Sequence, residues 1–299
     1  MADLLIENVS DTAFWIAHYR AQESARPDAL FRDPLAGLLA GERGKKIATG
    51  MPMSFMTRWT VVIRTCLIDD YLRLALVQGV DTVLNLGAGL DTRPYRMELP
   101  ESLTWVEADH PQIIEHKETR LAGERPRCRL ERVKLDLTNL AERRDLLDRV
   151  NAQAKQLLVL TEGVVPYLSM EEAGSLADDL QALDHVLYWI VDYFAPQTLK
   201  YRQRFWAKRW GQNVQFKFAP DDWFAFFAGH GWRSREIRYL PEEAERLHRP
   251  IEVPRLLRIL FKIRGFFASK ERGAAFRKFS GYVLLEPATP ENPAEQASA

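Results

Sequence analysis

The chain has 299 residues, of which 46% are hydrophobic, and its 41 lysines and arginines balance 41 aspartates and glutamates. Such a chain is long enough to bury one substantial core, as one large domain or two small ones. The zero net charge excludes a general attraction to nucleic acid, because that attraction depends on an excess of lysine and arginine over acidic residues.

Strand and helix patterns alternate along the chain. Apolar positions spaced as on a helix predict a helix over residues 59–76, which Gly79 ends. Strands are predicted at residues 81–86, 104–109, 130–135, 157–160, 186–193, 232–240 and 282–285. Further helices are predicted at residues 111–121, 140–154 and 170–183. This alternation is typical of βαβ units, so we expect a doubly wound, mostly parallel seven-stranded α/β sheet.

Two regions do not follow the alternation. We expect residues 1–286 to form a single domain, with 1–58 as an N-terminal helical lid and 196–275 as a helical cap insertion that contacts the substrate. Residues 287–299 contain proline and mostly small or polar residues, so we expect a disordered tail.

The cysteines and the start of the chain bear on the cellular compartment. Cys66 and Cys128 are not spaced as metal ligands, so we expect no metal site. With only two cysteines, the chain is typical of a reduced, cytoplasmic protein. Residues 1–8 carry acids where a secretory signal has a basic region. No stretch approaches the roughly 18 uninterrupted apolar residues of a membrane helix, so we expect no integral membrane association.

The strand pattern at 81–86 runs into two glycines, Gly87 and Gly89. Glycine has no Cβ, so such a turn lets the backbone approach a ligand closely. The next strand ends in Glu107 and Asp109, about 20 residues further on, where a second strand presents a carboxylate to ribose hydroxyls. This spacing predicts a site for a nucleoside-containing cofactor, although an ordinary tight strand–helix turn would also use two glycines.

The residues after the glycines indicate which cofactor this is. A dinucleotide fingerprint reads Gly-x-Gly-x-x-Gly, but Thr92 occupies the last position and Asp91 would repel a phosphate. A P-loop is excluded, because no Gly-Lys-Ser/Thr follows. An acidic turn suits S-adenosylmethionine (SAM), which carries an ammonium and a sulfonium. An NAD(P)-dependent oxidoreductase is the alternative that Asp91 and Thr92 disfavour.

Five separated segments together resemble a known family. They are residues 10–21, 30–34, 83–96, 105–111 and 161–168, in that order. The segments resemble the leucine carboxyl methyltransferase family, and more closely its bacterial branch of polyketide and small-molecule O-methyltransferases. The resemblance implies a SAM-dependent O-methyltransferase with a class I, Rossmann-like fold.

The resemblance also implies a role for particular residues. Arg64 would pair with the SAM carboxylate, Asp109 would bind the ribose with Glu107 as a second candidate, and Asp136 would accept the adenine amino group. Glu162, after the fourth strand, would balance the ammonium or sulfonium charge. By themselves, Arg64 also fits a surface position and Asp136 a helix N-cap. The expected cofactor-binding residues are Arg64, Gly87, Ala88, Gly89, Asp91, Arg93, Glu107, Asp109, His110, Asp136, Leu137, Glu162 and Gly163.

The methyl acceptor is less well defined by the sequence. A carboxylate acceptor needs no base, whereas a phenol or alcohol does, and no catalytic residue can be assigned. Candidate acceptor-binding residues are Tyr19, Arg20, Tyr167, Arg202 and Trp206, although aromatic residues interspersed with cations also fit a helix packed on a core. We expect a small-molecule acceptor and no nucleic acid partner, and a homodimer is compatible with the sequence. A non-catalytic SAM-binding protein is a further alternative.

Overall fold

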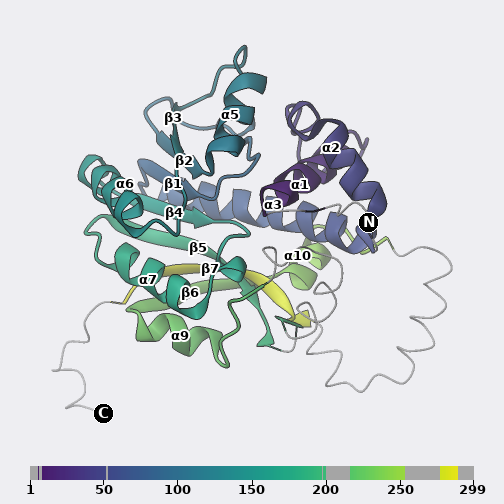
Figure 1. The fold of residues 1–299 in the computed structure, drawn as a ribbon. Helices are drawn as coiled ribbons and strands as arrows, with labels where there is room; N and C mark the ends of the chain where they lie inside the picture. The colour runs from purple at the N-terminus through teal and green to yellow at the C-terminus, as the bar shows by residue number, and fades with distance from the viewer. Residues whose placement is uncertain are drawn as a thin grey trace, which may run out of the picture.

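The structure is a computed structural model that describes residues 6, 9–51, 53–196, 198–199, 216–252 and 277–288. One sheet forms its centre (Figure 1), with the strand order β3-β2-β1-β4-β5-β7-β6. The strands are β1 (Thr82–Leu86), β2 (Thr104–Asp109), β3 (Arg129–Lys134), β4 (Leu157–Thr161), β5 (Val186–Phe194), β6 (Trp232–Tyr239) and β7 (Ser280–Pro287). The predicted α/β fold with a seven-stranded sheet is confirmed.

The direction of the strands fixes where a ligand can bind. β1 to β5 run parallel, and only β7 is antiparallel to its neighbours β5 and β6. The chain leaves β1 toward β2 and β3, then returns to β4 on the other side of β1. The crevice at this reversal, beyond the carboxyl ends of β1 and β4, is the usual ligand site of open α/β sheets.

Helices cover both faces of the sheet, and two more helices form an extension at the N-terminus (Figure 1). The N-terminal extension consists of α1 (Val9–Ser24) and α2 (Ala36–Gly50), which pack against each other. The remaining helices are α3 (Ser54–Val77), α4 (Arg93–Arg96), α5 (Pro111–Arg120), α6 (Leu140–Gln153), the 3-10 turn η1 (Val165–Tyr167), α7 (Met170–Gln181), α9 (Trp223–Gly229) and α10 (Leu240–Arg246). Among the described helices, none is both long enough and apolar enough to span a bilayer.

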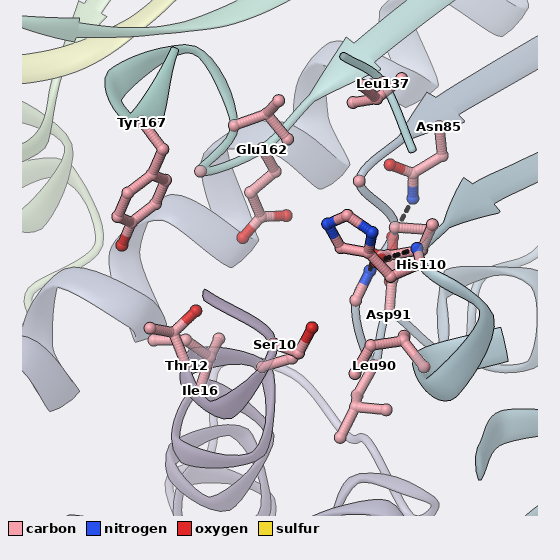
Figure 2. A pocket seen from close by; sticks show the side chains of 18 of the residues that line it. Ser10, Thr12, Ile16, Asn85, Leu90, Asp91, His110, Leu137, Glu162 and Tyr167 are labelled. Carbon is pink, nitrogen blue, oxygen red and sulfur yellow. Dashed lines mark hydrogen bonds between the residues drawn. The ribbon is translucent and has the colours of Figure 1, made fainter. Parts of the chain in front are cut away.

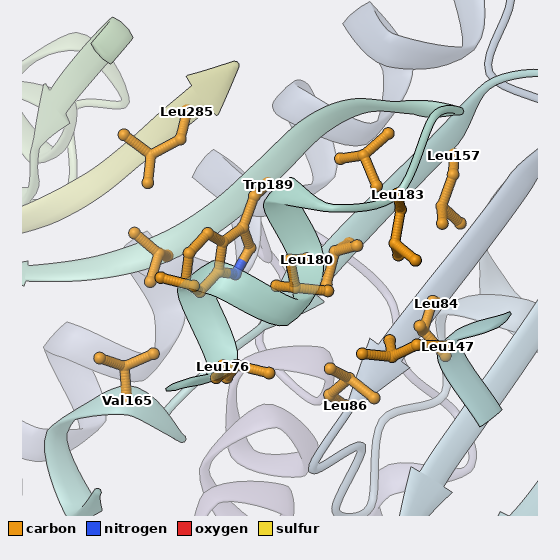
Figure 3. Packing of buried hydrophobic residues seen from close by; sticks show 14 of the residues in the cluster. Leu84, Leu86, Leu147, Leu157, Val165, Leu176, Leu180, Leu183, Trp189 and Leu285 are labelled. Carbon is orange, nitrogen blue, oxygen red and sulfur yellow. The ribbon is translucent and has the colours of Figure 1, made fainter. Parts of the chain in front are cut away.

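Alternation along the strands builds two hydrophobic cores. Leu84 and Leu86 of β1 point to the face that carries α6 and α7, together with Trp189 of β5 (Figure 3). Val83, between the two leucines, points to the opposite face, where it packs with α3. Successive side chains of a strand point to opposite faces, so a strand buried on both sides reads as a continuous apolar run. This explains why the short apolar runs in the sequence locate the parallel strands well.

Two predicted boundaries differ from the structure. Pro287, expected at the start of the tail, is the last residue of β7 and pairs with Trp232. The range 196–275, expected as a helical cap, also contains β6, the edge strand that was itself predicted at residues 232–240, so the cap cannot extend over the whole range. The parts of that range at 200–215 and 253–276 lie outside the described residues, as does the predicted tail from residue 289 onward.

Candidate cofactor-binding site

A cavity of about 330 Å³ lies beyond the carboxyl ends of β1, β2 and β4. Helix α1 closes its opposite side, where Ser10, Thr12 and Ile16 face the strand ends (Figure 2). Residues from α3 and from the loop after β4 complete the wall. The cavity therefore occupies the crevice at the reversal of strand order, with the N-terminal extension as its cover.

The turn after β1 requires glycine for reasons within the fold. Gly87 and Gly89 have positive φ angles of 66° and 49°, a region that residues with a Cβ rarely adopt. A Cβ at Gly87 would also collide with the side chain of Val164, in the loop after β4. The turn is held to β2 by the backbone N–H of Gly87, which donates to the Ala108 carbonyl at 2.8 Å. Close packing between the turn after β1 and the loop after β4 therefore requires glycine at position 87, whether or not a ligand is bound.

Asp109 ends β2 with its carboxylate beside this turn. One carboxylate oxygen accepts from the Gly89 N–H at 2.6 Å and the other from the His110 N–H at 2.7 Å. Burial raises the pKa of Asp109, although these two hydrogen bonds act to lower it. Asp109 and His110 both line the cavity, as their expected role requires.

Glu107 does not reach the cavity. Its side chain is completely buried and its Oε2 lies 2.8 Å from Lys117 Nζ and 3.1 Å from Arg132 Nε. It shares a strand face with Asp109, but α5 covers that face at Glu107 and leaves only Asp109 beside the cavity. This placement corrects the expectation of Glu107 as a second ribose-binding candidate.

Glu162 is bound by two arginines. Its Oε1 lies 2.8 Å from Arg64 Nε, and its Oε2 lies 2.8 Å from Arg93 Nη1. Burial raises the pKa of Glu162, but the charges of Arg93 and Arg64 outweigh it, so the pKa is lowered and the carboxylate stays ionised. Glu162 and Arg64 both line the cavity.

Arg93 is a counter-ion inside the protein. Only 2% of its side chain is exposed, and it pairs with Asp69 at 2.7 Å and Asp91 at 2.8 Å as well as with Glu162. It is absent from the described wall of the cavity. The expectation that Arg93 contacts the cofactor is therefore corrected. Arg93 instead holds Asp91 and Glu162, two acids that do line the wall.

Asn85 is a cavity residue that the sequence analysis missed. Its amide nitrogen donates to Asp91 Oδ2 at 3.0 Å, and a carboxylate can only accept, so the amide orientation is fixed. The remaining atom, Oδ1, is buried and has no hydrogen-bond partner within the described part of the chain. Figure 2 shows this oxygen directed toward the space between Glu162 and His110. The sequence feature that could have indicated it is a single amide side chain near the apolar end of β1.

Asp136 and Leu137 line the cavity after β3. Asp136 Oδ1 accepts from the Thr138 N–H at 2.9 Å and from its hydroxyl at 2.7 Å. The N-cap of α6 is Asn139, so the alternative of Asp136 as that cap does not hold.

The acceptor candidates separate into three groups. Tyr19 is buried in a core cluster with Trp15 and does not line the cavity, and Arg20 lines it but pairs with Asp33 at 2.9 Å. The expectation for Tyr19 is corrected, because its side chain is part of this core, whereas Arg20 stays an acceptor candidate on the cavity wall. Tyr167 lines the cavity and stacks on Phe216, with 5.0 Å between the ring centroids. The remaining two candidates, Arg202 and Trp206, lie outside the described residues.

Lys217 is another cavity residue that the sequence analysis did not name. It lines the wall near Tyr167, and its ammonium forms no ion pair with any described residue. The other two cations on the described wall, Arg20 and Arg64, are each paired with an acid. No motif marks Lys217 in a segment rich in lysine and arginine.

Comparison with known proteins gives a consistent result. A family model described as leucine carboxyl methyltransferase matches residues 13–181. A Parafrankia sp. (strain EAN1pec) protein designated an S-adenosyl-L-methionine-dependent methyltransferase is 32% identical, with 88% of this chain and 87% of that protein covered. A Streptomyces avermitilis protein of the same designation is 30% identical, with 81% and 89% covered.

Solved structures show the same fold. A protein of Thermobifida fusca designated a methyltransferase aligns with a TM-score of 0.56 at 14% identity, covering 96% of this chain and 97% of that one. At this identity the likeness concerns the fold alone. The family match and the relatives together show that the chain belongs to the leucine carboxyl methyltransferase family, a family of SAM-dependent methyltransferases.

Proposed function

We propose that this enzyme transfers the methyl group of SAM to an oxygen, a carboxylate or a hydroxyl, of a small polyketide-like acceptor. The observation that carries the proposal is the set of polar groups on one cavity wall: Asp109, Asn85 Oδ1, Glu162 and Arg64. Two of the groups are anionic, one is a neutral acceptor and one is a cation. This set complements a ribose, an ammonium, a sulfonium and a carboxylate.

The orphaned oxygen of Asn85 supports a resident ammonium. A buried acceptor without a partner costs about 1–3 kcal/mol, which a bound donor recovers. The SAM ammonium supplies such donors, and ionised Glu162 supplies the opposite charge nearby. Arg64 would receive the SAM carboxylate through its guanidinium. Asp109 would accept from the ribose hydroxyls, while Asp136 and the Leu137 backbone would receive the adenine.

When bound, SAM supplies an electrophilic methyl group. The chain's own residues would orient the two reactants and exclude water, with α1 closing the cavity over the strand ends. Orientation of this kind lowers the barrier of well-aligned reactions by up to about 7–11 kcal/mol. A carboxylate acceptor is already anionic and needs no base, so no described residue has to remove a proton.

The acceptor would bind at the Tyr167 end of the cavity. Tyr167, stacked on Phe216, offers an aromatic surface for a planar ring. Lys217 is a cation without a described acidic partner, so it favours an acceptor that carries a negative charge. We therefore propose a planar acid as the first acceptor class to test, and a phenol as the second.

Binding is the first test. Isothermal titration with S-adenosylhomocysteine (SAH) should show one site, NADH should not compete, and Arg64→Ala should weaken SAH binding by about 100-fold. The same variant should keep its affinity for 5′-methylthioadenosine, which lacks the amino-acid end. Wild-type affinity for SAH in Arg64→Ala would contradict the assignment.

Methyl transfer is the second test. Label from methyl-labelled SAM should appear in aromatic acids or phenols, and only a methyl ester releases labelled methanol in mild base. Binding of SAH together with no transfer to any acid or phenol would favour the alternative of a non-catalytic SAM-binding protein. Transfer to nitrogen or carbon alone would refute O-methylation.

A further inference from the structure

Asp192 is a buried acid behind the cofactor site, near the carboxyl end of β5. Only 4% of the residue is exposed, and it does not line the cavity. The Tyr282 hydroxyl of β7 donates to Asp192 Oδ1 at 2.7 Å, and the two residues are paired in the sheet register. The backbone N–H of Gly163 donates to Asp192 Oδ2 at 2.8 Å.

The second hydrogen bond links Asp192 to the cavity. Gly163 follows Glu162 directly, lines the cavity, and has a positive φ of 69°. Glu162 in turn holds Arg64 at 2.8 Å. A chain of contacts therefore runs from β7 through Asp192 to the loop that carries Glu162, and from there to Arg64.

The charges around Asp192 come from three elements. The titratable groups that face it within the described chain are Tyr282 on β7, Arg64 on α3 and Glu162 after β4. Burial raises the pKa of Asp192 to about 6, Tyr282, Arg64 and the Gly163 N–H act to lower it, and Glu162 acts to raise it. Its protonation state therefore changes around pH 6.

We propose that Asp192 is a positioning residue of the cofactor site, whose carboxylate holds the Glu162–Gly163 turn in the conformation that binds SAM. This inference rests on the proposed function, since it concerns the binding of the same cofactor. An ionised carboxylate accepts from both donors. A protonated one donates to the Tyr282 oxygen and keeps only a neutral acceptor for the Gly163 N–H, which is a weaker hydrogen bond. SAH binding should then weaken as the pH falls through about 6.

Three variants test this with SAH titrations over a range of pH. Asp192→Asn has the shape and hydrogen bonds of the protonated acid, so it should bind SAH about tenfold more weakly than wild type at pH 8 and lose the pH-dependent step. Tyr282→Phe removes a hydrogen bond that lowers the pKa of Asp192, so its step should move to higher pH. Tyr71→Phe is the matched control, because the Tyr71 hydroxyl donates to the backbone carbonyl of Tyr282 at 3.3 Å and forms no hydrogen bond with Asp192.

The outcomes separate the two proposals. His110 also lines the cavity, but it is common to all the variants, so differences between their profiles report Asp192. A wild-type profile in both Asp192→Asn and Tyr282→Phe would overturn the inference. If Asp192→Asn does not fold, as judged by circular dichroism, Tyr282→Phe alone tests the inference. A step at higher pH than in wild type supports it, and an unshifted step or a step at lower pH overturns it. Absence of SAH binding to the wild type at every pH would instead refute the proposed function.

Discussion

The ammonium of Lys117 lies 2.8 Å from the carboxylate of Glu107, and both side chains are completely shielded from solvent. Lys117 comes from α5 and Glu107 from β2, so the pair joins a helix to the strand that ends in Asp109. Arg132 on β3 adds a second cation at 3.1 Å. The pair fixes the helix that begins directly after the ribose-binding candidate, although neither of its members reaches the cavity.

Removal of Lys117 should therefore destabilise the fold. Lys117→Met leaves the buried charge of Glu107 with Arg132 alone, and breaking a buried pair from one side costs about 3–5 kcal/mol. The double variant Glu107→Leu with Lys117→Met should recover part of this loss, since no unpaired acid remains. Urea unfolding measures both values. A double variant that is less stable than the single one would contradict the view that unpaired charge causes the loss.

Asp109→Ala should abolish tight SAH binding while the protein stays folded. The change removes the acceptor for the ribose hydroxyls and frees the Gly89 N–H, so affinity should fall by about 100-fold or more. Titration calorimetry gives the affinity and circular dichroism verifies the fold. Asp145→Ala, at an exposed position on α6, is the matched control and should bind like wild type.

Strand positions were predictable from the sequence because burial on both faces leaves apolar runs. β2 lies at the predicted residues 104–109, and β4 differs from its prediction by one residue. The one-turn helix α4 was missed, since four residues carry no periodic pattern. Pro287 was expected outside the fold because proline suggests a loop, yet an edge pairing at a strand end tolerates it.

The site was predictable only where chain position implies chemistry. Asp109 and Glu162 follow strand ends, and parallel strands bring such ends to one edge. Glu107 and Arg93 were misassigned because both carry the charge of a ligand contact, and only packing shows that Lys117 and Asp69 neutralise them. Lys217 has no local signal, because its place on the cavity wall depends on how the chain crosses the sheet.

Asn85→Leu should weaken SAH binding selectively. It removes the unpartnered oxygen directed into the cavity and the hydrogen bond to Asp91, so SAH affinity should fall by about tenfold. Affinity for 5′-methylthioadenosine, which has no ammonium, should stay within about twofold of wild type. Equal losses for both ligands would mean that the change distorts the turn after β1, and would remove Asn85 from the binding set.

Lys217→Ala should act on the acceptor and leave the cofactor unaffected. An exposed cation that positions an acidic acceptor contributes about 1–2 kcal/mol, so KM for aromatic acids should rise about tenfold. SAH affinity should stay unchanged, and Lys217→Arg should restore most of the loss. Steady-state kinetics with an acid and a neutral alcohol of the same ring gives the contrast. An equal rise in KM for both acceptors would exclude a charge effect.

The protonation of Asp192 should also appear in the stability of the protein. Its pKa is about 6 in the folded chain against an ordinary 3.8, so between these values the folded state binds more protons than the unfolded state. Stability relative to Asp192→Asn should therefore fall as the pH rises from about 4 to about 6, by up to about 3 kcal/mol, and stay level above. Urea unfolding of both proteins across this range measures the difference. A difference independent of pH would show that Asp192 is ionised throughout. The expected fall means that the ionised carboxylate of Asp192 lowers the stability of the fold. Such a loss is expected for a group that is retained for cofactor binding.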